Sequence, residues 1–200
     1  MKNFLLFFLF ISLSNIVSAQ KLVSGEYDFG LNLSYDESSK MLTGYFENYT
    51  GLDEQTQNSK FSCIFYIEGK VTGKKFSIKT YYPEDKEDDI ILGTIEITNN
   101  KTIKIKLPEE HGGCWNVQHF ADKPEQFELE KKSNWIQVRY LDKNKSFFFK
   151  ENSNLSKTKM YLIKNDIVYV EKIENGKAFC SYKGKKIIKG WINIDDLNKL

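Results

Sequence analysis

The chain concentrates its chemically reactive side chains in residues 108–119, which read PEEHGGCWNVQH. This segment holds both histidines of the chain, one of its three cysteines and one of its three tryptophans. His111 or His119 beside Cys114 could lower the pKa of the thiol and accept its proton, as in a thiolate nucleophile. The same three side chains could bind Zn²⁺, although a fourth ligand at finger-like spacing is missing. Alternatively, a glycine pair beside Trp115 could shape a binding loop, so His111 and Trp115 are also candidate ligand-binding residues.

A disulfide bond is the competing use for Cys114. Cys63 lies in an alternating segment with Phe61 and Phe65, which predicts that all three face the interior from one strand. In an oxidising compartment, two cysteines within one β-domain usually pair. A bond between Cys63 and Cys114 would close a loop of about 50 residues and stabilise the fold by about 3–4 kcal/mol. A bond between Cys114 and Cys180 is the main alternative; otherwise Cys180 is a small buried apolar residue on a strand.

The acidic segment at residues 84–89, EDKEDD, carries five carboxylates in six residues. A Ca²⁺ loop needs six to eight oxygens folded around the ion, usually with a glycine at a sharp turn and ligands at alternating positions. That spacing is missing, so we expect a solvated hairpin tip and no metal site. The chain also lacks GxSxG, P-loop, Rossmann and HExxH motifs. We therefore expect no cofactor and no enzymatic activity.

Short alternating segments dominate the first two thirds of the chain. Residues 27–35 alternate apolar and polar side chains over a long run, which predicts one strand with a buried face. Residues 90–107 predict a hairpin, residues 48–58 are polar and predict a loop, and residues 135–141 predict a last strand. Many short strands separated by turns are typical of an all-β domain. We expect residues 20–144 to form an antiparallel sandwich or barrel.

The N-terminal segment predicts export. Lys2 is followed by an apolar run and then by small residues at 17–19, the pattern of a secretory signal peptide over residues 1–19. The run is too short to span a bilayer, which takes about 20 apolar residues. We expect a mature chain with no transmembrane segment, in the periplasm or outside the cell.

Charge is distributed unevenly along the mature chain. Residues 145–200 contain 12 lysines and 6 acidic residues, a net +6, whereas residues 20–144 contain 16 basic and 21 acidic residues, a net −5. The basic part could favour an anionic surface, or it could be a solvated lysine-rich surface. Arg139 is the single arginine, and arginine carries most base and phosphate recognition, so we expect no nucleic-acid partner.

The last quarter of the chain resembles a bacterial SH3-like (SH3b) domain. It opens with Tyr161-Leu162-x-Lys164-x-Asp166-x-Val168 and ends with Gly190-Trp191-Ile192 followed by Asp196-Leu197. Asn165 stands where the family usually has glycine, and Lys177 stands where it often has tryptophan. The resemblance implies a small SH3-like barrel over residues 145–200 that contacts a peptide, a cell-wall fragment or a protein. The aromatic residues expected on its binding face are Tyr161, Tyr169, Phe179, Tyr182 and Trp191.

Together these features predict an exported binding protein without catalysis. One alternative is an inhibitor or immunity protein that blocks a secreted enzyme with the loop at His111 to Trp115. The other is a hydrolase that uses Cys114 with His111 or His119.

Overall fold

The computed structural model describes residues 21–72, 75–84 and 89–200, and within them the chain is all-β. The predicted signal peptide therefore lies outside the described residues. The described helical turns are 3-10 turns of three residues each, and none is long and apolar enough to cross a membrane. The strands are β1 (Gly25–Tyr27), β2 (Leu31–Asp36), β3 (Met41–Leu52), β4 (Ser59–Thr72), β5 (Lys75–Tyr81), β6 (Ile91–Ile97), β7 (Thr102–Lys106), β8 (Glu125–Lys132), β9 (Gln137–Tyr140), β10 (Lys145–Phe149), β11 (Lys157–Ile163), β12 (Ile167–Glu174), β13 (Lys177–Lys183) and β14 (Ile187–Asn193).

Strands β1 to β8 form a closed antiparallel barrel in chain order, with β8 pairing back onto β1. The barrel is thus the correct one of the two predicted architectures. Eight strands enclose a space that side chains can fill. Alternate residues of the strands do so here: Leu31 and Leu33 of β2 and Phe65 and Ile67 of β4 are fully buried in one apolar cluster.

The single strand predicted over residues 27–35 is wrong, because a 3-10 turn at Asp28–Gly30 divides it into β1 and β2. Phe29 adopts a positive φ of 54°, which turns its side chain to solvent, where it is 56% exposed. Gly30 also has a positive φ, and a Cβ there would lie 2.0 Å from the carbonyl oxygen of Glu47. Local backbone geometry therefore overrides the alternating pattern at this point.

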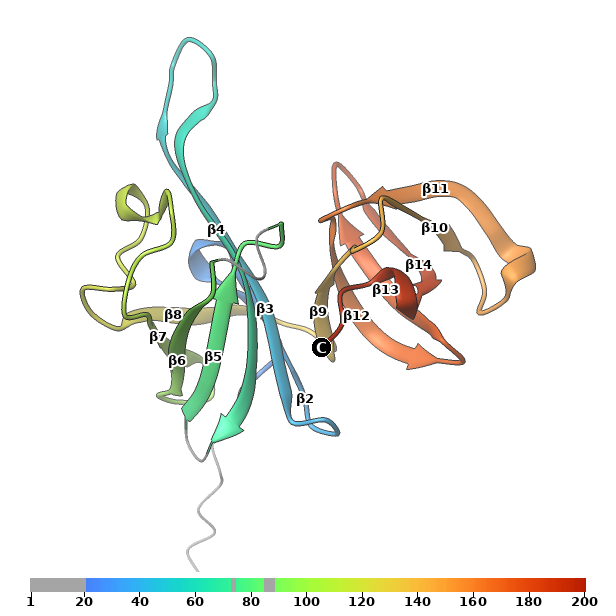
Figure 1. Cartoon of the computed structure of the whole chain (residues 1–200), viewed down its shortest axis with the longest axis horizontal. Helices are drawn as coiled ribbons and strands as arrows, with labels where there is room; N and C mark the ends of the chain where they lie inside the picture. Colours follow the sequence, from blue (N-terminus) through green and yellow to red (C-terminus); the bar gives the residue numbers. More distant parts are fainter. Residues whose placement is uncertain (1–20, 73–74, 85–88) are drawn as a thin grey trace, which may run out of the picture.

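The predicted loop over residues 48–58 is correct only for residues 53–58, because β3 runs to Leu52 and β4 begins at Ser59. Their hairpin extends well beyond the rest of the barrel (Figure 1). Phe61, expected to face the interior, is 41% exposed because it lies on this extension, whereas Cys63 is fully buried. Polar side chains can occupy both faces of a hairpin that leaves the core, so polarity alone did not distinguish it from a loop.

The second unit is a six-stranded sheet with the order β11-β10-β14-β13-β12-β9. Its core comprises buried residues of several strands, among them Phe148, Val168 and Ile192. β9, which we expected to end the first domain, pairs with β12 and so contributes to the second sheet from a point upstream of residue 145. Asn175 and Gly176 both have positive φ and form the tight turn between the paired strands β12 and β13.

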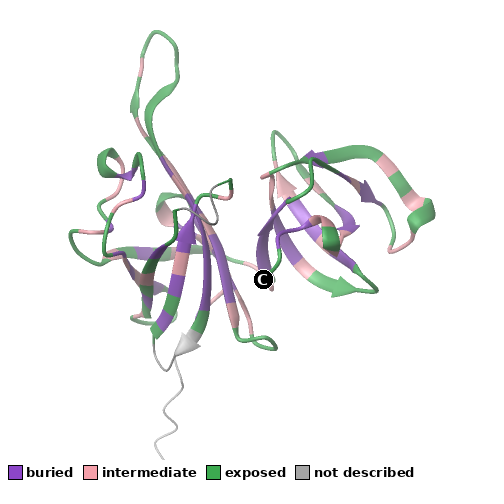
Figure 2. Cartoon of the chain, in the orientation of Figure 1, coloured by how far each residue is buried: buried purple, intermediate pink, exposed green. Residues whose placement is uncertain are grey.

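A third buried cluster joins the barrel to the second sheet along β9 (Figures 1 and 2). Tyr66 and Tyr81 leave the outer face of the barrel and pack against Tyr140, with ring centroids 5.0 and 6.4 Å away. The Tyr66 hydroxyl donates to the carbonyl oxygen of Val138 at 2.5 Å, and the Val138 N–H donates to Thr43 Oγ1 at 2.8 Å. Barrel side chains thus bond the outward polar groups of Val138 in β9, and Asn198 near the end of the chain bonds those of Tyr140.

Candidate functional site

The residues predicted to carry chemistry lie in the connection between β7 and β8, residues 107–124, which we call the stapled loop. The predicted disulfide is confirmed, because Cys63 of β4 is bonded to Cys114 of this loop. Gly113 precedes the cysteine with a φ of 85°, and a Cβ there would lie 2.3 Å from the carbonyl oxygen of Ser62. Glycine is therefore needed for the loop to approach β4 closely enough for the bond. Cys114 has no free thiol, so the nucleophile and zinc interpretations of this residue do not hold.

His111 is a buried residue of the stapled loop and has partners on both ring nitrogens. Its Nε2 lies 2.7 Å from Thr80 Oγ1, and its Nδ1 lies 3.2 Å from Asp89 Oδ2. The ring also stacks on Phe65, with centroids 5.0 Å apart, and burial lowers the pKa of His111. Burial favours the neutral ring, whose Nδ1–H can donate to Asp89, while the Thr80 hydroxyl shares its single proton between Nε2 and the carbonyl oxygen of Ile91, 3.0 Å away.

The order Asp89, His111, Thr80 matches that of an acid, a base and a hydroxyl nucleophile. However, Thr80 is fully buried and His111 is 4% exposed, so no substrate carbonyl can reach the hydroxyl. The arrangement instead connects the loop to β5. Residues 85–88 of the acidic segment lie outside the described residues, and its two ends, Glu84 and Asp89, accept hydrogen bonds from Asn165 Nδ2 and His111.

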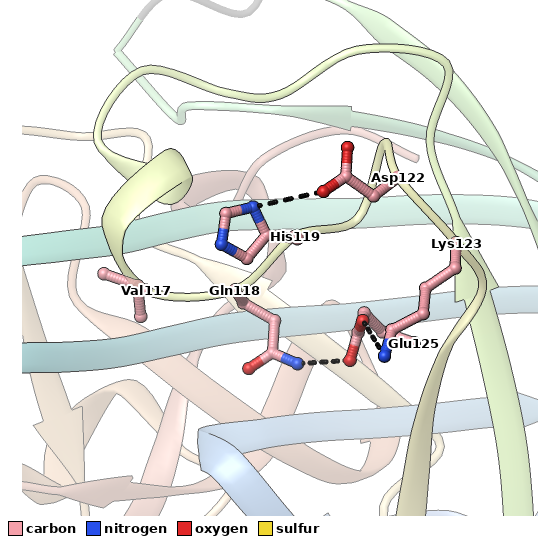
Figure 3. Close-up of a pocket in the computed structure, with 6 residues that line it drawn as sticks. All are labelled: Val117, Gln118, His119, Asp122, Lys123 and Glu125. Carbon is pink, nitrogen blue, oxygen red and sulfur yellow. Dashed lines mark hydrogen bonds and ion pairs between the residues drawn. The ribbon is translucent and has the colours of Figure 1, made fainter.

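The outer part of the stapled loop forms a shallow recess of about 510 Å³ (Figure 3). Its polar side chains point at one another: Gln118 Nε2 donates to Glu125 Oε2 at 2.6 Å, and His119 Nδ1 lies 3.6 Å from Asp122. Trp115 stands beside His119 with its side chain 60% exposed. The recess itself therefore offers few uncommitted polar groups, and the exposed Trp115 ring lies next to it without lining it.

The second sheet carries a different arrangement, a lateral row of side chains across its outer face. Strand pairing places Lys172, Phe179, Trp191, Phe149 and Lys157 opposite one another in that order, on β12, β13, β14, β10 and β11. Cross-strand partners lie on the same face of a sheet, so three rings form a continuous stripe with a lysine at each end. A second pair, Phe147 and Tyr161, extends the stripe on β10 and β11. We call this set, together with Lys145 and Lys177, the lysine–aromatic face.

The lysines of this face lie over the rings. Lys145 Nζ is 3.7 Å from the centroid of Tyr161, and Lys157 Nζ is 3.9 Å from that of Phe147. Lys172 lies 4.8 Å from Trp191 in the same way. These are cation–π distances, and the lysine stems cover the rings, which explains why Trp191 is buried although it lies outside the sheet's core.

Lys145 and Lys157 differ from Lys172 of the same face in their charged surroundings. Within the described residues, neither has a carboxylate at ion-pair distance, whereas Lys172 pairs with Glu174 at 3.2 Å. Lys177 is held by two neutral oxygens, those of Asn154 and Asn193, at 2.7 and 2.9 Å. The face therefore combines apolar rings with ammonium groups, of which those of Lys145 and Lys157 have no counter-charge among the described residues.

The structure divides the aromatic residues expected on the SH3-like face into three groups. Tyr161, Phe179 and Trp191 belong to the lysine–aromatic face. Tyr169 stacks on Trp135 at 4.3 Å in the cluster that joins the two units. Tyr182 packs against the core on the opposite face of the sheet.

Sequence reasoning missed two aromatic members of the face and all of its lysines. Phe147 and Phe149 flank the core residue Phe148, and in a strand their side chains must point away from it. That alternation was the available signal. No sequence signal marked the lysines, because the sequence alone does not distinguish a lysine that lies over a ring from one that is fully solvated.

Comparison of this chain with protein-family models, with curated proteins and with solved structures finds no match. Its function must therefore be inferred from the geometry of these two regions.

Proposed function

We propose that the protein is an exported, non-catalytic binding protein that holds a peptide or cell-wall fragment on its lysine–aromatic face. The proposal rests on the row of side chains from Lys172 through Phe179, Trp191 and Phe149 to Lys157. Rings in a stripe offer flat apolar contact to a sugar or side chain, and flanking ammonium groups attract carboxylates or phosphates. The net charge of +6 over residues 145–200 agrees with an anionic ligand.

Two further features support an exported binding protein. The predicted signal peptide and the Cys63–Cys114 bond both suit an oxidising compartment. The residues with catalytic potential are committed elsewhere, since Cys114 is bridged and His111 is buried. What remains accessible is suited to contact rather than to proton transfer.

The test is sedimentation of the mature protein with purified peptidoglycan over a series of salt concentrations. We expect retention at low salt and release as salt rises, because ion pairs with exposed lysines are screened. The double variant Lys145→Met with Lys157→Met should bind about tenfold more weakly. Lys185→Met with Lys186→Met removes the same charge from the exposed turn between β13 and β14 and should bind like the parent protein. If both double variants weaken binding equally, the effect is one of net charge alone, and the assignment of binding to the lysine–aromatic face is overturned.

A second candidate function rests on the opposite end of the molecule. The β3–β4 hairpin projects from the barrel and exposes Tyr49, Leu52 and Phe61, and Thr50 Oγ1 donates to the Asn116 carbonyl beside the exposed Trp115. A rigid projection with apolar side chains suits the cleft of another protein, as an inhibitor or immunity protein would require. Leu52→Asp should abolish capture of such an enzyme and leave peptidoglycan binding unchanged.

A further inference from the structure

The two edges of the second sheet differ in how their backbone polar groups are satisfied. At one edge, Thr43 and Tyr66 of the barrel bond the N–H and the carbonyl oxygen of Val138 in β9. At the other edge, β11 pairs only with β10 within the described residues. Figure 1 places β9 beside the barrel and β11 on the far side of the second sheet. One edge is therefore covered and the other is accessible.

The polar groups of β11 that face outward can be located from its end. The N–H of Ile163 donates to Asp166 Oδ2 at 2.8 Å, and its carbonyl accepts from the Asp166 N–H at 3.1 Å, so both point away from β10. Strand alternation gives Tyr161, two residues earlier, the same outward direction. Its side chain is 51% exposed. Tyr161 thus presents one donor and one acceptor at an open edge.

Charge decides what can pair with this edge. Lys157, Lys159 and Lys164 lie on or next to β11 and Lys145 on its neighbour, and residues 157–165 contain no acidic side chain. An antiparallel second copy would bring together the lysines of two such edges without supplying a carboxylate to any of them, and like-charge repulsion disfavours this. An acidic strand would place carboxylates beside Lys145 and Lys157, which have no counter-charge of their own.

We propose that β11 binds an extended acidic peptide as an added strand of the second sheet. The inference rests on the proposed function and specifies the ligand class and the mode of docking. Backbone hydrogen bonds at Tyr161 supply the register. On the lysine–aromatic face the peptide presents carboxylates; on the other face it presents apolar side chains beside Leu162 and the exposed Met160. Alternating acidic and apolar residues satisfy both faces.

The direct test uses a short synthetic peptide of alternating Glu and Val, labelled for fluorescence anisotropy at low salt. Two isomers are N-methylated, one at every Glu and one at every Val, so that each loses the N–H groups of one strand edge. We expect the parent peptide to bind and one isomer to bind at least about tenfold more weakly, because only one edge faces β11. Equal binding of all three peptides would overturn strand addition.

Variants of the protein separate this inference from the proposed function. Tyr161→Pro removes the outward N–H, and Tyr161→Ala keeps it, so the proline variant should bind the peptide more weakly than the alanine variant. If methylation has no effect but Lys145→Met with Lys157→Met weakens binding, strand addition fails and the proposed function stands. If neither the peptides nor peptidoglycan bind, both fail. A concentration-dependent dimer that Tyr161→Pro dissociates would identify a second copy as the occupant and overturn the proposal.

Discussion

The stapled loop and the lysine–aromatic face contain the side chains best suited to react with or bind other molecules. The two regions differ in where those side chains find partners. In the loop, Cys114 is bonded to Cys63, and His111 is held between Asp89 and Thr80. On the face, Lys145 and Lys157 lie over aromatic rings, and neither has a carboxylate of the described residues at ion-pair distance. Cys114 and His111 of the loop thus find their partners inside the molecule, whereas the charges of Lys145 and Lys157 remain available to a ligand.

This difference indicates which region acts on other molecules. A buried, fully partnered group contributes to stability and loses its reactivity, because burial and bonding exclude substrate. An exposed ammonium group over a ring contributes little to stability and remains able to bind an anion. Substitutions in the loop should therefore change stability, and substitutions on the face should change binding.

Breaking the disulfide should have the largest effect. Cys63→Ala with Cys114→Ala releases a constraint between residues 51 positions apart, which should lower the free energy of unfolding by about 3–4 kcal/mol. Guanidinium titration measures this change, and reductant should affect the parent protein but not the variant. Cys180→Ala is the matched control: its buried thiol is unbridged, and its loss should cost about 1 kcal/mol with no response to reductant.

Removing the buried imidazole should have the next largest effect. His111→Ala leaves Thr80 without its ring partner and opens a space beside Phe65, which should cost about 2–3 kcal/mol. Thermal unfolding checks this value against Trp115→Ala, an exposed residue of the same loop that should change stability far less. Similar losses from both would show that the loop is held as a whole rather than through His111.

The same residue should make stability depend on pH. Burial lowers the pKa of His111 below its ordinary value of 6.5, so the unfolded chain takes up a proton first as pH falls. The stability that the neutral His111 ring contributes is fully present above pH 6.5. It is lost as the pH falls from there towards the lower pKa of His111 in the folded state. Unfolding titrations from about pH 7.5 to about pH 5 should show a shallower slope for His111→Gln than for the parent protein. Parallel slopes would contradict a buried neutral ring.

The loop was more predictable from sequence than the face, for physical reasons. Cysteines pair by chemistry that few alternatives match, so the position of Cys63 in an alternating strand sufficed to find the bond. The triple Phe147-Phe148-Phe149 hides its alternation because all three residues are apolar. Alternation places Phe147 and Phe149 on the face opposite to that of Phe148, but which of the two faces is the core depends on pairing with β14 and β11.

The fold divides in the same way. Alternation predicted an all-β chain, but closure of the barrel depends on β8 pairing with β1, about a hundred residues away in sequence. Membership of β9 in the second sheet is likewise fixed by contacts with β12 and with the barrel residues Thr43 and Tyr66. Long-range pairing of this kind cannot be inferred from periodicity.

Lys183 lies over aromatic rings, as the lysines of the face do, but its charge is paired inside the molecule, as the polar groups of the loop are. Its Nζ lies over Trp135 and Tyr169 at 4.7 and 4.4 Å, as on the face, but it also pairs with Glu26 of the barrel at 3.0 Å. Lys183→Met keeps the apolar stem and removes the charge, which should cost about 1 kcal/mol. Differential scanning calorimetry would show the loss, and Lys185→Met, on an exposed turn, should show none. A loss at Lys185 of the same size would reduce the effect to net charge.

The smallest effect on stability is expected where the effect on binding is greatest. Lys157→Met removes an exposed ammonium group from above Phe147 without uncovering a buried carboxylate, so unfolding should change by less than about 0.5 kcal/mol. Guanidinium titration and peptidoglycan sedimentation on the same preparation measure the two effects together. A loss of stability above about 1 kcal/mol with unchanged binding would mean that Lys157 stabilises the second sheet, as His111 stabilises the barrel, and does not bind a ligand. Weakened binding at unchanged stability would instead mean that the charge is available to a ligand because nothing in the fold neutralises it.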